Sequence, residues 1–170
     1  MTAVRLSVVA ALLVVATSLQ VGIFSQLAID GVVPDLALLV VIGAALVRGP
    51  DYAAVLGFFA GLCLDLAPPA DHTAGRWALA LVVVGWLAGQ VRHDAGHSAA
   101  AAVVTVAAGS FIGTSLFALS GLVLGDPGVT VSRVLTVVPL AMLYDVALTP
   151  FVLPLLIGLF RRLGVATERW

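Results

Sequence analysis

Long apolar blocks alternate with short polar segments along the chain. Windows of about twenty residues predict six membrane-spanning helices, at about 6–28, 35–48, 52–67, 76–91, 99–124 and 134–160. Because a perpendicular crossing of the hydrocarbon core needs about twenty residues, the second and third helices are short and need loop residues or a protein cover at their ends. The pattern predicts an all-α membrane protein in which residues 1–170 form one integral membrane domain, a bundle of six transmembrane helices.

The first block resembles a secretory signal, since Arg5 precedes the apolar run LSVVAALLVVA. We interpret it as an uncleaved first span, because its apolar residues continue to about Ile29 and no small-x-small cleavage site closes it.

The last block contains Pro139, Pro150 and Pro154. Each proline removes a backbone donor and presses on the preceding turn, so this helix is expected to bend. Carbonyls freed within hydrocarbon need neighbouring helices or water, which predicts that the last helix packs inside the bundle rather than at its lipid edge.

The composition agrees with a membrane location and excludes some functions. Hydrophobic residues make up 62% of the chain and charged residues 10%, whereas soluble domains are about half apolar and a quarter charged. Every basic residue is an arginine, and these are spread over the loops without forming a basic patch, so nucleic-acid binding is not expected. Cys63 lies in an apolar run and is interpreted as a packing residue.

The arginines mark alternate loops. Six fall on one side of the predicted topology and two, Arg76 and Arg133, on the other. The first group is Arg5, Arg48, Arg92, Arg161, Arg162 and Arg169. Because basic residues favour the cytoplasmic side, both termini are predicted to be cytoplasmic, with the loops that hold Asp30, Asp71, His72 and Asp126 facing outward.

Small residues recur at every fourth position of the third block. Ala53, Gly57, Gly61 and Asp65 lie on one slowly drifting helix face, and Gly85 and Gly89 repeat the spacing in the fourth block. Helices in lipid associate through close packing and polar contacts. These faces therefore serve either tight packing within the chain, the simpler interpretation, or contact with a partner subunit.

Two carboxylates near predicted helix ends have structural explanations. Asp65 is expected toward the outer side, where it forms an ion pair with Arg76, contacts a helix end or lines an outward-facing pocket. Asp35 follows Pro34 at the start of the second block, where a helix favours both a proline and a negative charge.

Asp145 is predicted near the bilayer midplane, as the one carboxylate at that depth. It lies about 18 Å along its helix from Arg133. Insertion scales assign an aspartate there a cost of about 2.5 to 3.5 kcal/mol. Either a buried structural hydrogen bond or a role in partner contact or conformational switching explains it. Neighbouring Tyr144 points to a different helix face.

No catalytic motif is present: the sequence has no GxSxG, HExxH or P-loop pattern. We therefore expect a protein that is not an enzyme and needs no cofactor. His93 and His97 have a spacing that could hold a metal on a helix, but solvated loop residues explain them better than a metal site does.

The stretch from Pro34 to Arg92 resembles the rod shape-determining protein MreD family. The similarity rests on four motifs in order, a P-D-L opening, an A-L-V-R-G exit, a G-F-x-x-G-L-x-x-D-L helix and an L-x-G-Q-V-R end. The outer loop ADHTAGRW departs from the S-G-x-x-L-G-x-H run associated with many family members.

The resemblance implies a non-catalytic scaffold of the bacterial cell-elongation complex in the cytoplasmic membrane. Its implied partners are the single-span protein MreC and, through it, RodA and a class B penicillin-binding protein. The family's fold is similar to the substrate-binding S subunits of energy-coupling-factor vitamin transporters, which supplies one alternative. A small proton-coupled transporter dependent on Asp145 is another.

Overall fold

The computed structural model describes residues 2–68, 72–95 and 98–164. Within these ranges the regular structure is helical, apart from one isolated bridge between Ile29 and Val32. The helices are α1 (Thr2–Gly22), the 3-10 helix η1 (Phe24–Leu27), α2 (Leu36–Arg48), α3 (Pro50–Leu66), α4 (Arg76–Gln90), α5 (Arg92–Ala95), α6 (Ala99–Val123) and α7 (Val131–Gly164). A helix lies in each of the six predicted blocks, whereas α5 was not predicted, and α1 starts and ends earlier than expected.

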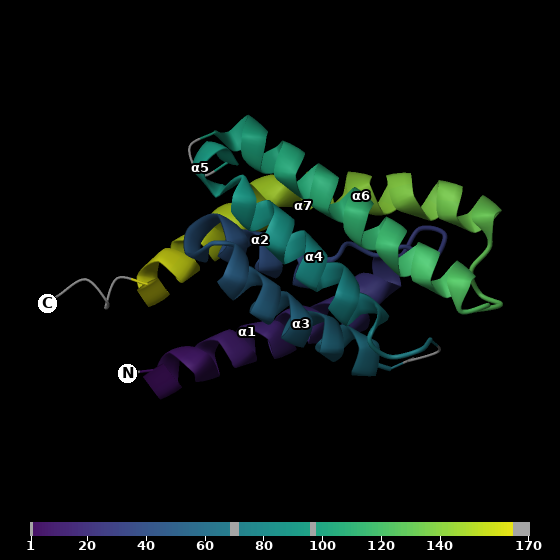
Figure 1. The fold of residues 1–170 in the computed structure, drawn as a ribbon, viewed down its shortest axis with the longest axis horizontal. Coiled ribbons are helices and arrows are strands. Elements are labelled where there is room, and N and C mark those ends of the chain that lie inside the picture. Colours follow the sequence, from purple (N-terminus) through teal and green to yellow (C-terminus); the bar gives the residue numbers. More distant parts are fainter. Residues whose placement is uncertain (1, 69–71, 96–97, 165–170) are drawn as a thin grey trace, which may run out of the picture.

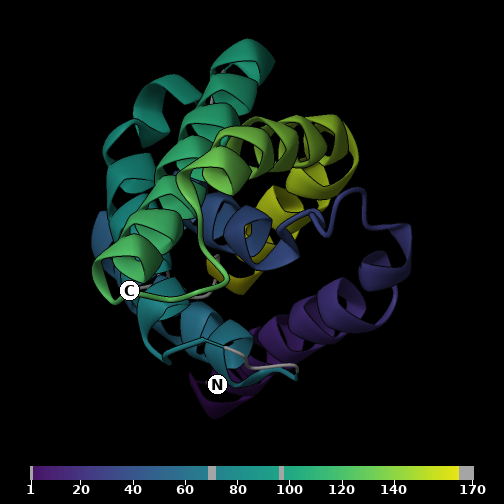
Figure 2. The ribbon, with the colours of Figure 1, turned by 90° about the vertical axis from the view of Figure 1, so that its right-hand side faces the viewer.

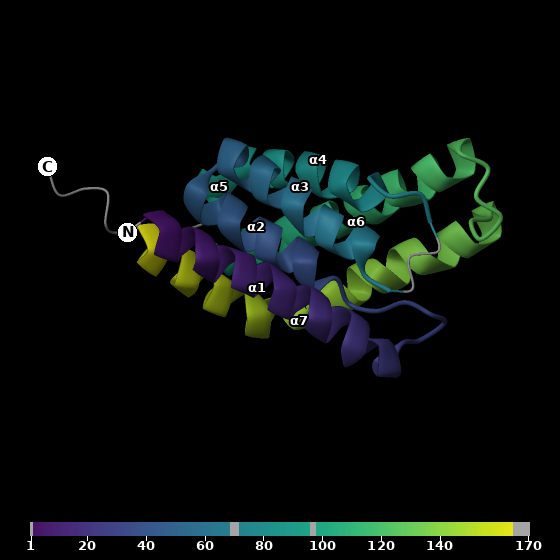
Figure 3. The same ribbon diagram turned by 90° about the horizontal axis from the view of Figure 1, so that it is seen from below.

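Three stretches of the described chain are long and apolar enough to cross a membrane, which indicates a membrane protein. They are Ala3–Leu27, Ala99–Val123 and Val131–Gly164. The helices form an elongated bundle whose connections gather at two ends (Figure 1). The start of α1 and the end of α7 lie at one end, together with the α2–α3 connection and α5 (Figures 1 and 3).

The central element is α2, which the other helices surround (Figure 2). All residues from Leu36 to Leu46 are buried, as expected for a helix that is apolar on every side. Its N-cap is Asp35, whose Oδ1 accepts the Leu38 N–H at 2.9 Å, and it ends before Gly49, which has a φ of 90°. At 1.5 Å per residue such a helix is about 20 Å long, less than the hydrocarbon core of about 30 Å. The surrounding helices therefore provide the cover that a short apolar helix needs.

Glycines bring α3 and α4 into backbone contact. At four glycines of this helix pair, a Cβ atom would collide with the backbone of the other helix. The contacts are Gly57 with Leu81, Gly61 with Ala78, Gly85 with Ala53 and Gly89 with Pro50. The small-residue face of α3 is thus covered by α4 of the same chain.

The prediction that the last helix lies inside the bundle is wrong. Only one stripe of α7 is buried, and its opposite side is exposed, with Leu135, Leu143, Phe151 and Leu155 each between 63% and 75% exposed. The buried stripe is Val138, Ala141, Asp145, Thr149, Leu153, Leu156 and Phe160. All three prolines of α7 are exposed, and the helix changes direction along its length (Figure 1). The bend lets α7 curve around α2, which takes the central position instead.

Candidate functional site

A buried polar cluster joins the start of α2 to α6 and α7. The Asp145 carboxylate accepts two short hydrogen bonds, from the Asp35 backbone N–H to Oδ1 at 2.7 Å and from Ser110 Oγ to Oδ2 at 2.6 Å. Asp145 is 1% exposed and Ser110 is fully buried. Because buried polar groups are costly unless they are hydrogen-bonded, these contacts fix the relative positions of three helices.

The sequence predicted that Asp145 is the one carboxylate at its depth. This prediction is wrong, because Asp35 lies beside it. The reason is the path of the chain before α2. Asp30 and Gly31 form a tight turn with φ values of 51° and 77°, closed by reciprocal backbone hydrogen bonds between Ile29 and Val32. Residues 33–35 then lead from this turn to α2, which begins inside the bundle.

The two carboxylate oxygens of Asp35 have different surroundings. Oδ1 accepts the N–H of Leu38, whereas Oδ2 is buried without a hydrogen-bond partner in the described chain. The neighbouring donor, the N–H of Ala37, is accepted by Gln20 Oε1 from α1 at 3.2 Å. The first turn of α2 therefore has its backbone donors satisfied by side chains, while one acidic oxygen is left over.

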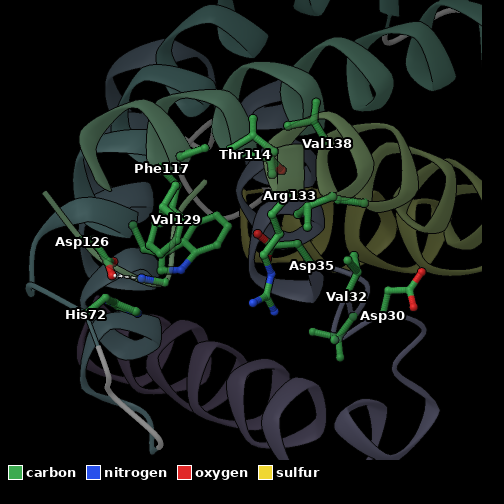
Figure 4. Close-up of a pocket in the computed structure, with 18 of the residues that line it drawn as sticks. Asp30, Val32, Asp35, His72, Thr114, Phe117, Asp126, Val129, Arg133 and Val138 are labelled. Carbon is green, nitrogen blue, oxygen red and sulfur yellow. Dashed lines mark hydrogen bonds between the residues drawn. The ribbon is translucent and has the colours of Figure 1, made fainter. Parts of the chain in front are cut away.

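Asp35 also lines a cavity of about 460 Å³. The cavity lies between the end of α1, the turn before α2, the start of α4, α6, the α6–α7 loop and the start of α7 (Figure 4). Its size falls in the range of about 300 to 1,000 Å³ that is typical of small-molecule sites. Trp77, His72 and Phe117 form an aromatic end, with Trp77 stacked on Phe117 at 4.5 Å between ring centroids. Arg133 and Asp30 also line it.

The predicted ion pair between Asp65 and Arg76 does not form. Arg76 Nη1 instead donates to Asp126 Oδ2 at 2.6 Å, Nε donates to Ser120 Oγ at 3.1 Å and Nη2 donates to the Phe117 carbonyl at 2.8 Å. The guanidinium also lies 4.0 Å from the centroid of the Phe117 ring. Arg76 therefore fastens the α6–α7 loop to the start of α4.

The pKa of Asp126 lies below its ordinary value of 3.8. The larger cause is the hydrogen bond from the Gly128 backbone N–H, followed by the hydrogen bond from Arg76. Both contacts favour the ionised carboxylate, so the contact between Arg76 and Asp126 is strongest when Asp126 is charged.

Asp65 makes the helix-end contact that was its alternative explanation. Its Oδ2 accepts the N–H groups of Gly75 and Ala78 at 2.8 and 3.1 Å, and Oδ1 accepts that of Trp77 at 3.1 Å. The carboxylate at the end of α3 therefore satisfies the free donors at the start of α4. This contact explains why a helix with a small-residue face ends in an aspartate.

The remaining predicted residues are dispersed. Tyr144 donates its hydroxyl to the Leu27 carbonyl at 3.3 Å, away from the cluster. His93 lies in α5, whereas His97, Asp71 and Arg169 lie outside the described residues.

Sequence reasoning missed Gln20, Ser110 and Arg133 as parts of this region. Gln20 and Ser110 are polar residues within apolar blocks, which is a usable signal of a buried contact. Arg133 was interpreted as a marker of topology alone.

Comparison with known proteins gives no match, since no family model, no curated protein and no solved structure matches the chain.

Proposed function

We propose that this protein is an MreD-like scaffold of the cytoplasmic membrane in a bacterium. In this proposal it holds an MreC-like single-span protein, and through it the RodA and class B penicillin-binding protein pair, in the complex that maintains cell shape during peptidoglycan synthesis. It catalyses no step of that synthesis itself.

The observation that carries the proposal is the position of the residues behind the resemblance. The P-D-L opening supplies the N-cap of α2, and the A-L-V-R-G exit ends α2 at Gly49. The third motif contributes Gly57 and Gly61 to the contact with α4, and Asp65 to the cap of α4. Motifs that look loose one by one therefore share one role, because they join α2, α3 and α4 into a single unit.

We further propose that α1, α2, α3, α4, α6 and α7 all cross the membrane, with both termini in the cytoplasm. The basis is that Arg48 and Arg92 lie at the end of the bundle where α1 starts, while Arg76 and Arg133 lie at the other end (Figure 1). Cytoplasmic ends of membrane proteins are enriched in basic residues.

A partner helix needs an exposed face, because the glycines of α3 and α4 are each covered by the backbone of the other helix. The outward side of α3 carries large apolar side chains, with Phe58 and Phe59 at 45% and 54% exposure and their rings in an edge contact. Aromatic residues are enriched in protein interfaces. We therefore place the MreC-like helix against this side of α3.

Photo-crosslinking tests the assignment. A photoreactive phenylalanine analogue is placed at Phe59 of α3 and, as a matched control, at Phe151 of α7, which is 71% exposed. After purification from the source bacterium, a crosslink to an MreC-like protein from position 59 but not from 151 is expected. Co-purification of no elongation protein with the wild type would contradict the scaffold function.

A solute-binding function, as in the S subunits of vitamin transporters, is the second candidate. The cavity of about 460 Å³, with aromatic residues and Arg133 in its walls, favours it. Mass spectrometry of the purified protein distinguishes the two, because an S subunit retains a vitamin and co-purifies with transporter components, whereas a scaffold co-purifies with MreC.

A further inference from the structure

Asp35 lines the inner part of the cavity between α1, α2, α6 and α7, and one of its carboxylate oxygens is buried without a hydrogen bond. Asp35 is 6% exposed, and its Oδ2 has no hydrogen-bond partner in the described chain. A buried carboxylate oxygen without a donor is costly. Its neighbour Asp145 supplies no donor for it, because both oxygens of Asp145 accept hydrogen bonds of their own. A positive charge bound in the cavity beside the Asp35 carboxylate would offset this cost, because Asp35 has no ion-pair partner among the described residues.

Arg133 supplies positive charge to the outer part of the cavity, which Asp30 also lines. Arg133 is exposed, and its guanidinium makes no hydrogen bond or ion pair with the described residues. Figure 4 shows its side chain extending into the cavity in front of Asp35. The carboxylate of Asp126, which also lines the cavity, is occupied by Arg76. Arg133 is therefore available to an anionic group.

Apolar side chains make up much of the rest of the cavity wall. Six of the lining residues are valines, namely Val32, Val33, Val129, Val134, Val137 and Val138. Arg133 Nη2 lies 3.5 Å from the position that a Cβ on Gly31 would occupy. Asp35 is four residues further along, and four extended residues span at most about 14 Å. A single small ligand can therefore reach both charges.

We propose that this cavity binds a small zwitterion whose ammonium group contacts the Asp35 carboxylate and whose anionic group contacts Arg133. Methylene groups of the ligand contact the valines of the cavity wall. The charged ends match because neither Asp35 nor Arg133 has an ion-pair partner among the described residues. This inference is independent of the scaffold function, since a scaffold and a solute-binding subunit could both use such a site.

A series of ω-amino acids measures the separation of the two charges. Glycine, 4-aminobutyrate, 6-aminohexanoate and 8-aminooctanoate are titrated into the full-length protein in detergent, and heat is recorded by calorimetry. Affinity is expected to be highest for the member whose length matches the separation of the two charges, and to fall for the other lengths. Hexylamine and hexanoate, which each carry one charge, are expected to bind at least about tenfold more weakly than 6-aminohexanoate, because each loses one charge-assisted contact. Failure of every amino acid in the series to bind at millimolar concentration would overturn the proposal.

Variants at the two ends of the proposed site, Asp35 and Arg133, show whether the probe binds in this cavity. Asp35→Asn keeps an N-cap residue for α2. Arg133→Gln changes an exposed side chain that makes no hydrogen bond or ion pair with the described residues. The Arg133 variant therefore tests the site even if Asp35→Asn does not fold. Each is expected to weaken binding of the best probe by about tenfold or more, with Arg133→Lys retaining part of the affinity. Arg48→Gln, at the opposite end of the bundle, is the matched control and should bind as the wild type does. Unchanged affinity in Arg133→Gln would exclude this site.

The zwitterion could be a soluble molecule or the headgroup of a lipid. The titration is therefore repeated in nanodiscs of phosphatidylethanolamine and of phosphatidylglycerol. Probe binding that is lost only in phosphatidylethanolamine identifies the headgroup as the occupant, whereas equal binding in both identifies a soluble zwitterion.

Discussion

At the scale of single residues, the carboxylates of Asp65, Asp35 and Asp145 all accept hydrogen bonds from backbone N–H groups. Each accepts backbone N–H groups at the start of a helix, α4 for Asp65 and α2 for the other two. The first N–H groups of a helix have no partner within it, and helices in lipid gain little from apolar burial alone. Asp65 and Asp145 therefore stabilise this bundle by joining the start of one helix to another helix, whereas Asp35 caps its own helix.

Arg76 stabilises the α6–α7 loop in a way that depends on pH. Because the pKa of Asp126 is lowered from 3.8 in the folded protein, its ionised form contributes stability above the unfolded value, and this contribution is lost as the pH falls through 3.8 toward the lower folded pKa. The thermal midpoint of the wild type in detergent should therefore exceed that of Asp126→Asn by a constant amount from about pH 7 to pH 5, and the difference should shrink at lower pH.

Asp94→Asn provides the control for this pH series. Asp94 is exposed and makes no hydrogen bond or ion pair in the described chain, so the variant should follow the wild-type profile. A difference between wild type and Asp126→Asn that stays constant down to about pH 3 would show that the charge of Asp126 does not hold the loop.

At the scale of elements, the α3–α4 contact depends on the absence of side chains. A methyl group at Gly57 or Gly61 would meet backbone atoms of α4, which cannot yield as the end of a flexible side chain can. Leucine at either position is expected to separate the two helices and, if the scaffold function holds, to abolish rod morphology in the source bacterium.

Alanine substitutions test this contact with a control from the same chain. Gly61→Ala is expected to lower the free energy of unfolding by about 1 to 3 kcal/mol through overpacking. Gly158, within α7, has nothing within 4 Å of its Cβ position, so Gly158→Ala should be neutral or stabilising by up to about 1 kcal/mol from helix propensity. Denaturation of both variants in mixed micelles, followed by circular dichroism, measures the two values. Equal effects would remove the backbone contact as the explanation.

Hydrophobic blocks predict where the helices lie, because a span is a local property of the sequence. The positions of the helices relative to one another depend on contacts between distant segments. The depth of Asp145 was counted from Arg133 along its own helix, which gave no information about Asp35 on α2. The prolines correctly predicted a bent α7, but not that all three would lie on its outer side. The small-residue spacing predicted a packing face on α3, but it did not predict that α4 would cover this face.

At the scale of the whole molecule, the two ends of the bundle differ in charge and in shape. The end where α1 starts carries Arg48 and Arg92, and the other end holds the cavity. In the topology proposed from the positive-inside rule, the cavity opens away from the cytoplasm. A zwitterion would then enter from outside the cell, while a partner helix would contact the side of α3.

Cysteine labelling tests both this orientation and the six crossings. In a Cys63→Ala background, which removes the native cysteine, single cysteines replace one residue in or next to each connection between the six helices, at Asp30, Asp51, Thr73, Asp94 and Thr130. All five side chains are exposed. Because successive connections alternate between the two ends of the bundle, a membrane-impermeant maleimide added to intact spheroplasts should label positions 30, 73 and 130. Positions 51 and 94 should be labelled only after permeabilisation. The reverse pattern would invert the orientation, and two successive positions with the same accessibility would show that the helix between them does not cross. Short helices such as α2 and α4 make this a direct test, because their ends can lie on opposite faces of the membrane only if the surrounding protein replaces lipid along their length.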